Sequence, residues 1–181
     1  WSEYYRQMGA LAALLMRIFA VALGRPEDHF EDKIDKHISR LRVRNYPAQV
    51  QTPAPGQIRA GAHSDYGSLT ILATEDKPGG LQVCNARNEW VDVPIVPDCF
   101  IINIGDLLSR WTNDAWVSTL HRVVNPPAGA GAESRRQSLV FFHNPNHDAL
   151  IANLIPGEAD KYPPTTSGEH LKALYTATQN A

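Results

Sequence analysis

A histidine and an aspartate lie two residues apart in the segment HSDYGSLT, residues 63–70. In an extended strand, the side chains of residues i and i+2 point to the same face, so His63 and Asp65 can reach one cation together. Imidazole and carboxylate ligands suit Fe(II), and two histidines with one carboxylate leave open positions at the metal. The pair therefore predicts part of a metal site, although His and Asp are also common in polar turns.

A second histidine, His121, lies in the segment TLHRVVN. This segment is apolar and β-prone, so a histidine has little packing reason to be there, and His121 is the best candidate for the third ligand. Taken alone, a histidine in a strand is more often a core or rim residue than a ligand. The three residues together predict a site with two imidazoles and one carboxylate.

Arg136 and Ser138, in RQSLVFF, also lie two residues apart. They would share one strand face with Val140 and Phe142, and the apolar character of that face indicates that it points into the fold. An arginine on an inward apolar face needs an anion, and its parallel N–H groups fit a carboxylate. The pair predicts a carboxylate-binding site. The alternatives are an ion pair between Arg136 and a carboxylate of the protein itself, or a solvated Arg136.

The elements that must position these residues are mostly short strands. About eight β-prone runs between residues 38 and 144 are separated by turns rich in Gly, Pro, Asn and Asp, which favours a sandwich, barrel or jelly roll. The runs are SRLRVRNY, QIRAGAH, SLTILAT, GLQVCN, EWVDVPI, CFIINIG, TLHRVVN and RQSLVFFHN. Only GDLLSRWTND interrupts them with a helical turn.

Helices are expected at both ends of the chain. Apolar residues recur at spacings of three and four from about residue 2 to residue 23, which predicts a helix with one buried stripe. Thr166 and Glu169 have the spacing of a capping box, which predicts a final helix near SGEHLKALYTAT. The expected stripe of the first helix consists of Met8, Leu11, Leu15, Ile18 and Ala22.

The order of these motifs resembles the isopenicillin N synthase-like family of 2-oxoglutarate and Fe(II)-dependent dioxygenases, in its C-terminal catalytic domain. The resemblance implies a mainly β fold, a double-stranded β-helix (jelly roll), with a long N-terminal helix and a C-terminal helix. It implies a helical support segment (1–36), the jelly-roll oxygenase domain (37–150) and a C-terminal tail with its helix (151–181). The matching stretches are LRVRNYP, GQIRAGAHSDYGSLTIL, GLQV, WVDVP, FIINIGDLLSRWTND, TLHRVVNP and RQSLVFF.

The resemblance implies that His63, Asp65 and His121 bind Fe(II), with no catalytic side chain beyond these ligands. With 2-oxoglutarate as cosubstrate and O2, such an enzyme hydroxylates, desaturates or cyclises a small organic molecule and releases succinate and CO2. Three alternatives stay open: an isopenicillin N synthase-type Fe(II) oxidase that does not use 2-oxoglutarate, a non-catalytic jelly-roll fragment, and a zinc hydrolase with the same ligand types. The sequence does not indicate which substrate is used.

The resemblance also implies a cosubstrate site. Arg136 and Ser138 would bind the distal carboxylate of 2-oxoglutarate, and Tyr46 would hydrogen-bond the cosubstrate. Phe142 and Asn103 are candidate pocket residues.

One position departs from the family. Many members carry an asparagine two positions before the tyrosine, where this chain has Arg44. Arg40, Arg42 and Arg44 alternate with apolar residues, so we interpret them as one polar strand face and not as a nucleic-acid-binding patch.

Composition narrows the classes of partner. The chain has 17 Lys and Arg against 19 Asp and Glu, a net charge of -2, so no basic field indicates nucleic acid. The sequence contains no stretch of 18 apolar residues, so we expect no membrane-spanning helix. We expect a soluble, cytoplasmic monomer that acts on a small molecule without nucleic-acid or membrane partners. Because the chain begins at Trp1, we also expect a fragment of a longer polypeptide. The resemblance implies that a region before the long helix helps to form the substrate pocket.

Three further histidines and the two cysteines are interpreted as structural residues. We expect His29 and His37 to be exposed, His143 to face outward, and Cys84 and Cys99 to be buried free thiols.

Overall fold

The computed structural model describes residues 1–49, 51–77 and 80–179 of the 181-residue chain. The helices are α1 (Ser2–Ala22), α2 (Glu31–Ile34), α3 (Asp106–Trp111), the 3-10 helix η1 (Gly131–Ser134) and α4 (Ser167–Gln179). The strands are β1 (Arg40–Tyr46), β2 (Ala60–His63), β3 (Leu69–Thr74), β4 (Leu81–Cys84), β5 (Trp90–Asp92), β6 (Ile101–Ile104), β7 (His121–Val123), β8 (Arg136–His143), β9 (Leu150–Ile151) and β10 (Thr165–Thr166).

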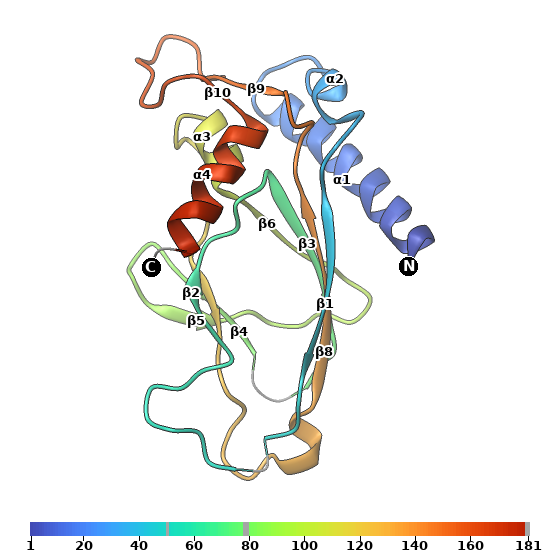
Figure 1. Ribbon diagram of the computed structural model, residues 1–181, viewed down its shortest axis with the longest axis vertical. Coiled ribbons are helices and arrows are strands. Elements are labelled where there is room, and N and C mark those ends of the chain that lie inside the picture. The colour runs from blue at the N-terminus through green and yellow to red at the C-terminus, as the bar shows by residue number, and fades with distance from the viewer. Residues whose placement is uncertain (50, 78–79, 180–181) are drawn as a thin grey trace.

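Two four-stranded antiparallel sheets form the body of the domain (Figure 1). One has the strand order β1-β8-β3-β6, and the other has the order β2-β7-β4-β5. Strands far apart in the sequence are neighbours within each sheet, as in a jelly roll. Each predicted β-prone run contains one of the strands β1 to β8. The predicted fold, mainly β with a helix at each end of the described chain, is confirmed.

Helix α1 covers the outer face of the β1-β8-β3-β6 sheet. It buries Met8, Ala12, Met16 and Ala20, which form one core with Leu69 and Ile71 of β3 and Phe141 of β8. The predicted stripe is therefore correct only in part. Leu11 and Leu15 are half-buried against this core, whereas Ala22 is exposed and Ile18 is 53% exposed. Apolar residues surround most of this helix, so their spacing does not select one face, and small alanines let the helix approach the sheet closely.

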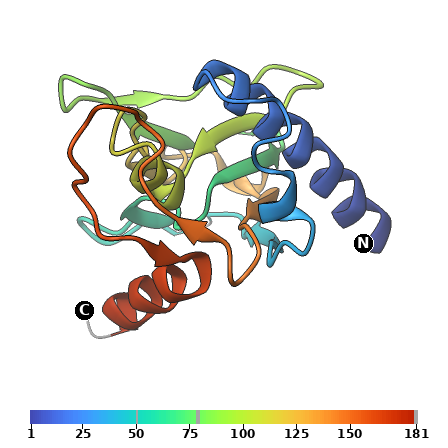
Figure 2. The same ribbon diagram turned by 90° about the horizontal axis from the view of Figure 1, so that it is seen from above.

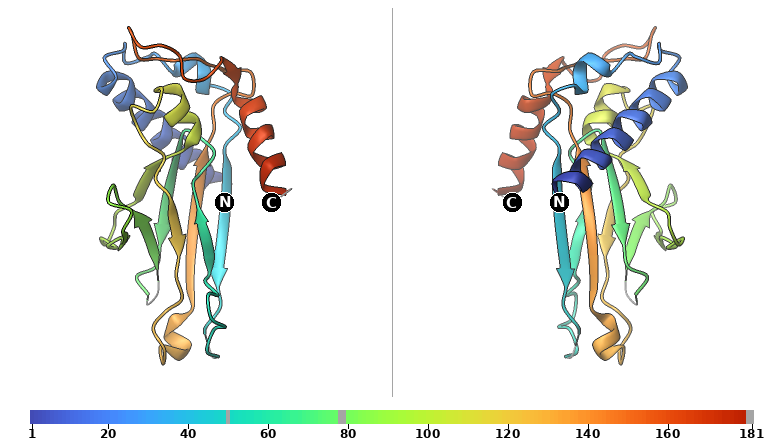
Figure 3. Two further views of the ribbon diagram at one scale, coloured as in Figure 1. Left: turned by 90° about the vertical axis from the view of Figure 1, so that its left-hand side faces the viewer. Right: turned by 90° about the vertical axis from the view of Figure 1, so that its right-hand side faces the viewer.

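Helix α4 begins with the predicted capping box. The backbone N–H of Glu169 donates to the Thr166 hydroxyl over 3.2 Å, and the backbone N–H of Thr166 donates to the Glu169 carboxylate over 3.1 Å. Seen from above, α1 and α4 lie on different sides of the sheets (Figure 2). The four α-helices gather toward one end of the sheets, whereas the opposite end carries loops and η1 (Figure 3).

Several expectations about single residues are wrong. Cys99 is exposed and Cys84 is half-buried, although both are free thiols as expected. His29 and His37 are half-buried, and the His37 ring stacks on Tyr5 with 5.8 Å between ring centroids. His143 lies on the outer face of β8, but it is only 1% exposed. Its burial follows from the layer formed by α1 and the segment around His37, which covers this face.

None of the helices in the described ranges combines the length and apolarity needed to cross a membrane.

Candidate active site

The space between the two large sheets contains a cavity with side chains from both of them. Strands β1, β8, β3 and β6 provide one wall, and residues from β2, β4 and β7 provide the other. All eight residues that were singled out from the sequence line this cavity: Tyr46, His63, Asp65, Asn103, His121, Arg136, Ser138 and Phe142. The fold therefore brings together the predicted metal ligands and the predicted cosubstrate residues.

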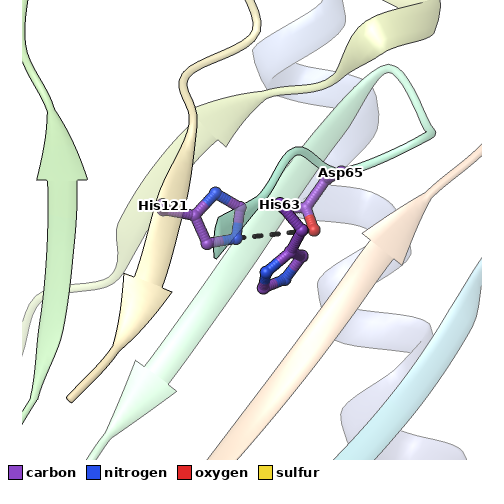
Figure 4. Close-up of side chains that lie close together, drawn as sticks. All are labelled: His63, Asp65 and His121. Atoms are coloured by element: carbon purple, nitrogen blue, oxygen red, sulfur yellow. Dashed lines mark ion pairs between the residues drawn. The ribbon is translucent and has the colours of Figure 1, made fainter. Parts of the chain in front are cut away.

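His63, Asp65 and His121 form a compact group (Figure 4). One potential ligand atom from each residue lies within 4.8 Å of the others, and His121 Nε2 lies 3.8 Å from Asp65 Oδ1. His63 ends β2 and His121 begins β7, where the two strands pair. Asp65 lies beyond the end of β2, so the assumption that one strand carries both His63 and Asp65 is wrong. The chain turns after His63, and this turn aims the carboxylate at the two imidazoles.

Hydrogen bonds orient all three side chains. His63 Nδ1 lies 2.8 Å from the Gly61 carbonyl oxygen, and His121 Nδ1 lies 3.0 Å from the Thr119 carbonyl oxygen. A ring that donates from Nδ1 presents a free Nε2 to a metal, which is the usual arrangement behind a metal-binding histidine. Both rings are therefore oriented so that their Nε2 atoms can serve as ligands.

The Asp65 carboxylate is held at one oxygen only. The Thr70 hydroxyl donates to Oδ2 over 2.7 Å, and the Asn103 amide donates to the same oxygen over 2.9 Å. Oδ1 accepts neither bond and lies on the side of His121. This leaves one carboxylate oxygen and two imidazole nitrogens for a cation, a donor set that suits Fe(II).

The NIGD segment positions the loop that carries Asp65. The backbone N–H of Asp106 donates to the Asp65 carbonyl over 2.7 Å, and the Ser64 hydroxyl donates to the Asp106 carboxylate over 3.0 Å. Gly105 lies so close to Gly67 that a Cβ atom at Gly105 would collide with the Gly67 carbonyl oxygen. A glycine is required at this close approach between α3 and the Asp65 loop.

Arg136 is the second chemical feature of the cavity. The residue is 3% exposed, and no carboxylate in the described ranges forms an ion pair with it. Its Nε atom has no hydrogen-bond partner among the described residues, and burial lowers the pKa of its guanidinium. A buried charge of this kind calls for an anionic ligand.

The pairing of β1 with β8 surrounds Arg136 with suitable neighbours. Tyr46 lies directly opposite Arg136, and Arg44 lies opposite Ser138. The Arg136 guanidinium carbon lies 5.0 Å from the centroid of the Tyr46 ring. Directly opposite residues of an antiparallel pair share one face, so Tyr46, Arg136 and Ser138 form one edge of the cavity.

Sequence reasoning missed two features of this region. Thr70, which holds Asp65, could have been found because SLTIL alternates and places Thr70 on the face opposite to Leu69 and Ile71. The other feature is a second cavity, beside the first, that Arg40, Arg42 and Arg44 line together with α4. Its existence depends on packing between distant segments, for which the sequence carries no local signal.

Comparisons with known proteins agree with this geometry. The family model of the 2OG-Fe(II) oxygenase superfamily matches residues 37–145. The 2-oxoglutarate-Fe(II) type oxidoreductase hxnY of Emericella nidulans is 33% identical over an alignment of 180 residues that covers 96% of this chain and 50% of that protein. Homoarginine-6-hydroxylase 2-ODD-233 of Oryza sativa is 35% identical, over 93% of this chain and 52% of that protein.

A solved structure gives the same result. The crystal structure of a full-length Neurospora crassa protein in complex with alpha-KG aligns with a TM-score of 0.90 and 37% identity, covering 97% of this chain and 55% of that one. The chain spans about half the length of the curated relatives it matches. From the matched residues and the shared fold, the chain belongs to the 2OG-Fe(II) oxygenase superfamily.

Proposed function

We propose that the protein is an Fe(II)- and 2-oxoglutarate-dependent oxygenase that oxidises a small organic molecule. The observation that carries this proposal is Arg136, a buried guanidinium without an ion-pair partner among the described residues, in the same cavity as the His63–Asp65–His121 group. A metal site alone would fit many enzymes. A metal site beside a buried carboxylate receptor fits a metal-chelating dicarboxylate cosubstrate.

His63, Asp65 and His121 would hold Fe(II) through two Nε2 atoms and Asp65 Oδ1. Bound Fe(II), with 2-oxoglutarate and O2, supplies the oxidation of a substrate C–H bond, and succinate and CO2 are released. The protein contributes a fixed arrangement of ligands that leaves one side of the metal open. Thr70 and Asn103 keep Asp65 Oδ2 occupied, so the carboxylate stays in one orientation.

Arg136 and Ser138 would bind the carboxylate of 2-oxoglutarate that lies away from the metal, with Tyr46 beside them. The guanidinium offers parallel N–H donors to both oxygens of a carboxylate. The apolar side chains of Leu72, Val140 and Phe142 line the same cavity. They restrict water around the charged groups, which strengthens each electrostatic contact.

A zinc hydrolase is less well supported by this cavity. Hydrolysis at a metal-bound water requires a general base within reach, and Asp65 is the only acidic residue among the described residues that line the cavity. Hydrolysis at a zinc-bound water also does not require a buried arginine such as Arg136.

An anaerobic titration tests the proposal. Fe(II) and then 2-oxoglutarate are added to the chain, and the visible metal-to-ligand charge-transfer band is recorded. We expect the band for the unmodified chain, its loss in Asp65→Ala because the metal is lost, and a much higher 2-oxoglutarate requirement in Arg136→Gln. Iron binding without the band would favour an isopenicillin N synthase-type oxidase, and absence of iron binding would contradict the metal site.

Other features of the whole protein also stay proposals. We keep the division into a support segment (1–36), a jelly-roll domain (37–150) and a C-terminal tail (151–181), together with a monomeric state and a cytoplasmic location. Sedimentation analysis of the chain tests the monomer directly.

A further inference from the structure

Three arginines line a second cavity next to the candidate metal site. This cavity has a volume of about 260 Å³, and its lining includes His63 and Asp65 on one side. Arg40, Arg42 and Arg44 of β1 lie on another side. Helix α4 provides further lining residues, namely Leu171, Tyr175, Thr178 and Gln179.

The register of the β1–β8 pair fixes the direction of the three arginines. Arg40 lies opposite Phe142, Arg42 opposite Val140, and Arg44 opposite Ser138. These partners are the cavity-facing residues of β8, so alternation along β1 places all three guanidinium groups on the same side. Arg44 lines both cavities, which places it where the cosubstrate site and the second cavity meet.

The positive charges of these arginines are not neutralised by nearby acidic residues. In the described part of the chain, none of the three forms an ion pair, and Asp65 is the only acidic residue that lines the second cavity. Arg40 is held by α4, because its Nη1 donates to the Tyr175 hydroxyl over 3.2 Å and its guanidinium lies 5.3 Å from the Tyr175 ring centroid. Arg42 lies over the Phe142 ring at 5.8 Å.

Binding of Fe(II) and 2-oxoglutarate in the first cavity would not neutralise the positive charge of these three arginines. The two charges of Fe(II) and the charge of Arg136 balance Asp65 and the two carboxylates of 2-oxoglutarate. The guanidinium groups of β1 then still face the space in which a substrate would approach the metal. Arg40 and Arg42 are exposed and Arg44 is half-buried, so solvent screens part of the repulsion among the three like charges. An anion between Arg42 and Arg44 relieves the remainder.

We propose that the substrate is a small carboxylic acid whose carboxylate binds Arg42 and Arg44, an inference that rests on the proposed function. Both guanidinium groups can offer paired N–H donors to a carboxylate, while Arg40 remains engaged with Tyr175. The body of the acid would lie against Phe142 and Tyr175, which line the same cavity. Anchoring one end of the substrate leaves a C–H bond further along it facing the side of His63 and Asp65.

Matched acids and amides test this inference. Phenylacetate is compared with phenylacetamide, and hexanoate with hexanamide, by isothermal titration calorimetry of the chain loaded with Fe(II) and 2-oxoglutarate under nitrogen. We expect at least one acid to bind about tenfold or more tightly than its amide, because only the acid can form charge-assisted hydrogen bonds with the arginines. Arg42→Gln and Arg44→Gln should each lower the affinity for the acid and leave that for the amide unchanged.

Arg87→Gln is the control, because Arg87 is an exposed arginine in the loop between β4 and β5 and its replacement removes the same charge. It should leave both affinities unchanged. Equal binding of acid and amide, failure of both acids to bind, or unchanged affinity in the Arg42 and Arg44 variants would overturn the inference.

The same samples separate this inference from the proposed function. The 2-oxoglutarate titration that precedes each experiment reports on the proposed function alone. If 2-oxoglutarate binds and the acids show no preference, only the inference fails. If 2-oxoglutarate does not bind, the proposed function fails, and the acid and amide pairs are compared on the metal-free chain, where the same preference is expected and its absence overturns the inference.

Discussion

The two faces of strand β8 have different surroundings, because one lines the cavity and the other packs in the core. Arg136, Ser138 and Phe142 face the cavity between the sheets. Phe141 and His143 alternate with them and face the layer formed by α1 and the segment around His37, where both are at most 1% exposed. One strand therefore supplies a candidate ligand site with one set of side chains and a closely packed core with the other.

The side chains that β8 places on its two faces also differ in whether they have partners. On the core face, the Ser68 hydroxyl lies 2.7 Å from His143 Nδ1, and Phe141 packs edge-to-face with Tyr5 at 5.3 Å between centroids. On the cavity face, Arg136 Nε has no partner among the described residues. Satisfied groups contribute to stability, whereas a buried group without a partner costs stability and indicates a ligand.

The largest effect on the cavity face is expected for Asp65→Ala. If Asp65 binds the metal as proposed, its removal should lower the affinity for Fe(II) by more than about a hundredfold, because even the loss of residues behind metal ligands costs up to that factor. Equilibrium dialysis with metal analysis measures it, and circular dichroism checks the fold. Asp148→Ala, an exposed aspartate in the loop before β9, is the control; equal iron binding by the two variants would remove Asp65 from the site.

Phe141→Ala and Phe142→Ala compare the two faces at neighbouring positions. Phe141 is fully buried in the α1 core, so its truncation should cost about 3–5 kcal/mol of the free energy of unfolding. Phe142 is half-buried at the cavity, so its truncation should lower the free energy of unfolding by less. Urea denaturation followed by fluorescence gives both values, and a larger loss for Phe142→Ala would contradict the assignment of the faces.

Arg136→Gln should separate ligand binding from stability. We expect 2-oxoglutarate to bind about ten- to a hundredfold more weakly, because a charge-assisted bidentate contact is lost. The free energy of unfolding without ligands should stay the same or rise, because a buried charge lacking an ion pair is removed. Arg135→Gln, at the exposed neighbouring arginine, is the control. A marked loss of stability in Arg136→Gln alone would indicate a structural role.

The core face should be sensitive to acid. Burial lowers the pKa of His143 to about 3, below its ordinary value of 6.5, so the unfolded chain binds a proton there more readily than the folded chain at intermediate pH. Stability is therefore complete above about pH 6.5 and falls as the pH drops toward 3, by about 2 kcal/mol between pH 7 and pH 5. Urea titrations of the metal-free chain at both values measure this loss. It should shrink in His143→Gln, and an unchanged loss would assign it to other groups.

The sequence predicted the strands and the residues that line the cavity more reliably than the packing around them. Alternation and turn residues located the strands β1 to β8, and the two-residue spacing of Arg136 and Ser138 placed them on one face. The buried side of α1 was predicted only in part, because apolar residues surround most of that helix and Ala12, Met16 and Ala20 are its most buried residues after Met8. The alternation of residues also could not show that β2 ends at His63, before Asp65.

Long-range packing explains the other failures. The burial of His143 depends on α1 and His37, both more than 100 positions earlier in the chain. Similarly, Arg40, Arg42 and Arg44 look like an ordinary polar strand face until α4 closes the cavity beside them. Interactions between segments so far apart leave no trace in local periodicity.

A crystal structure of the chain grown with Mn(II) and 2-oxoglutarate under nitrogen tests the central claim most directly. We predict the metal at His63 Nε2, Asp65 Oδ1 and His121 Nε2, with the distal carboxylate of 2-oxoglutarate on Arg136 and Ser138. A metal bound elsewhere, or a cosubstrate whose distal carboxylate does not contact Arg136, would contradict the assignment of one face of β8 to ligand binding and the other to the core.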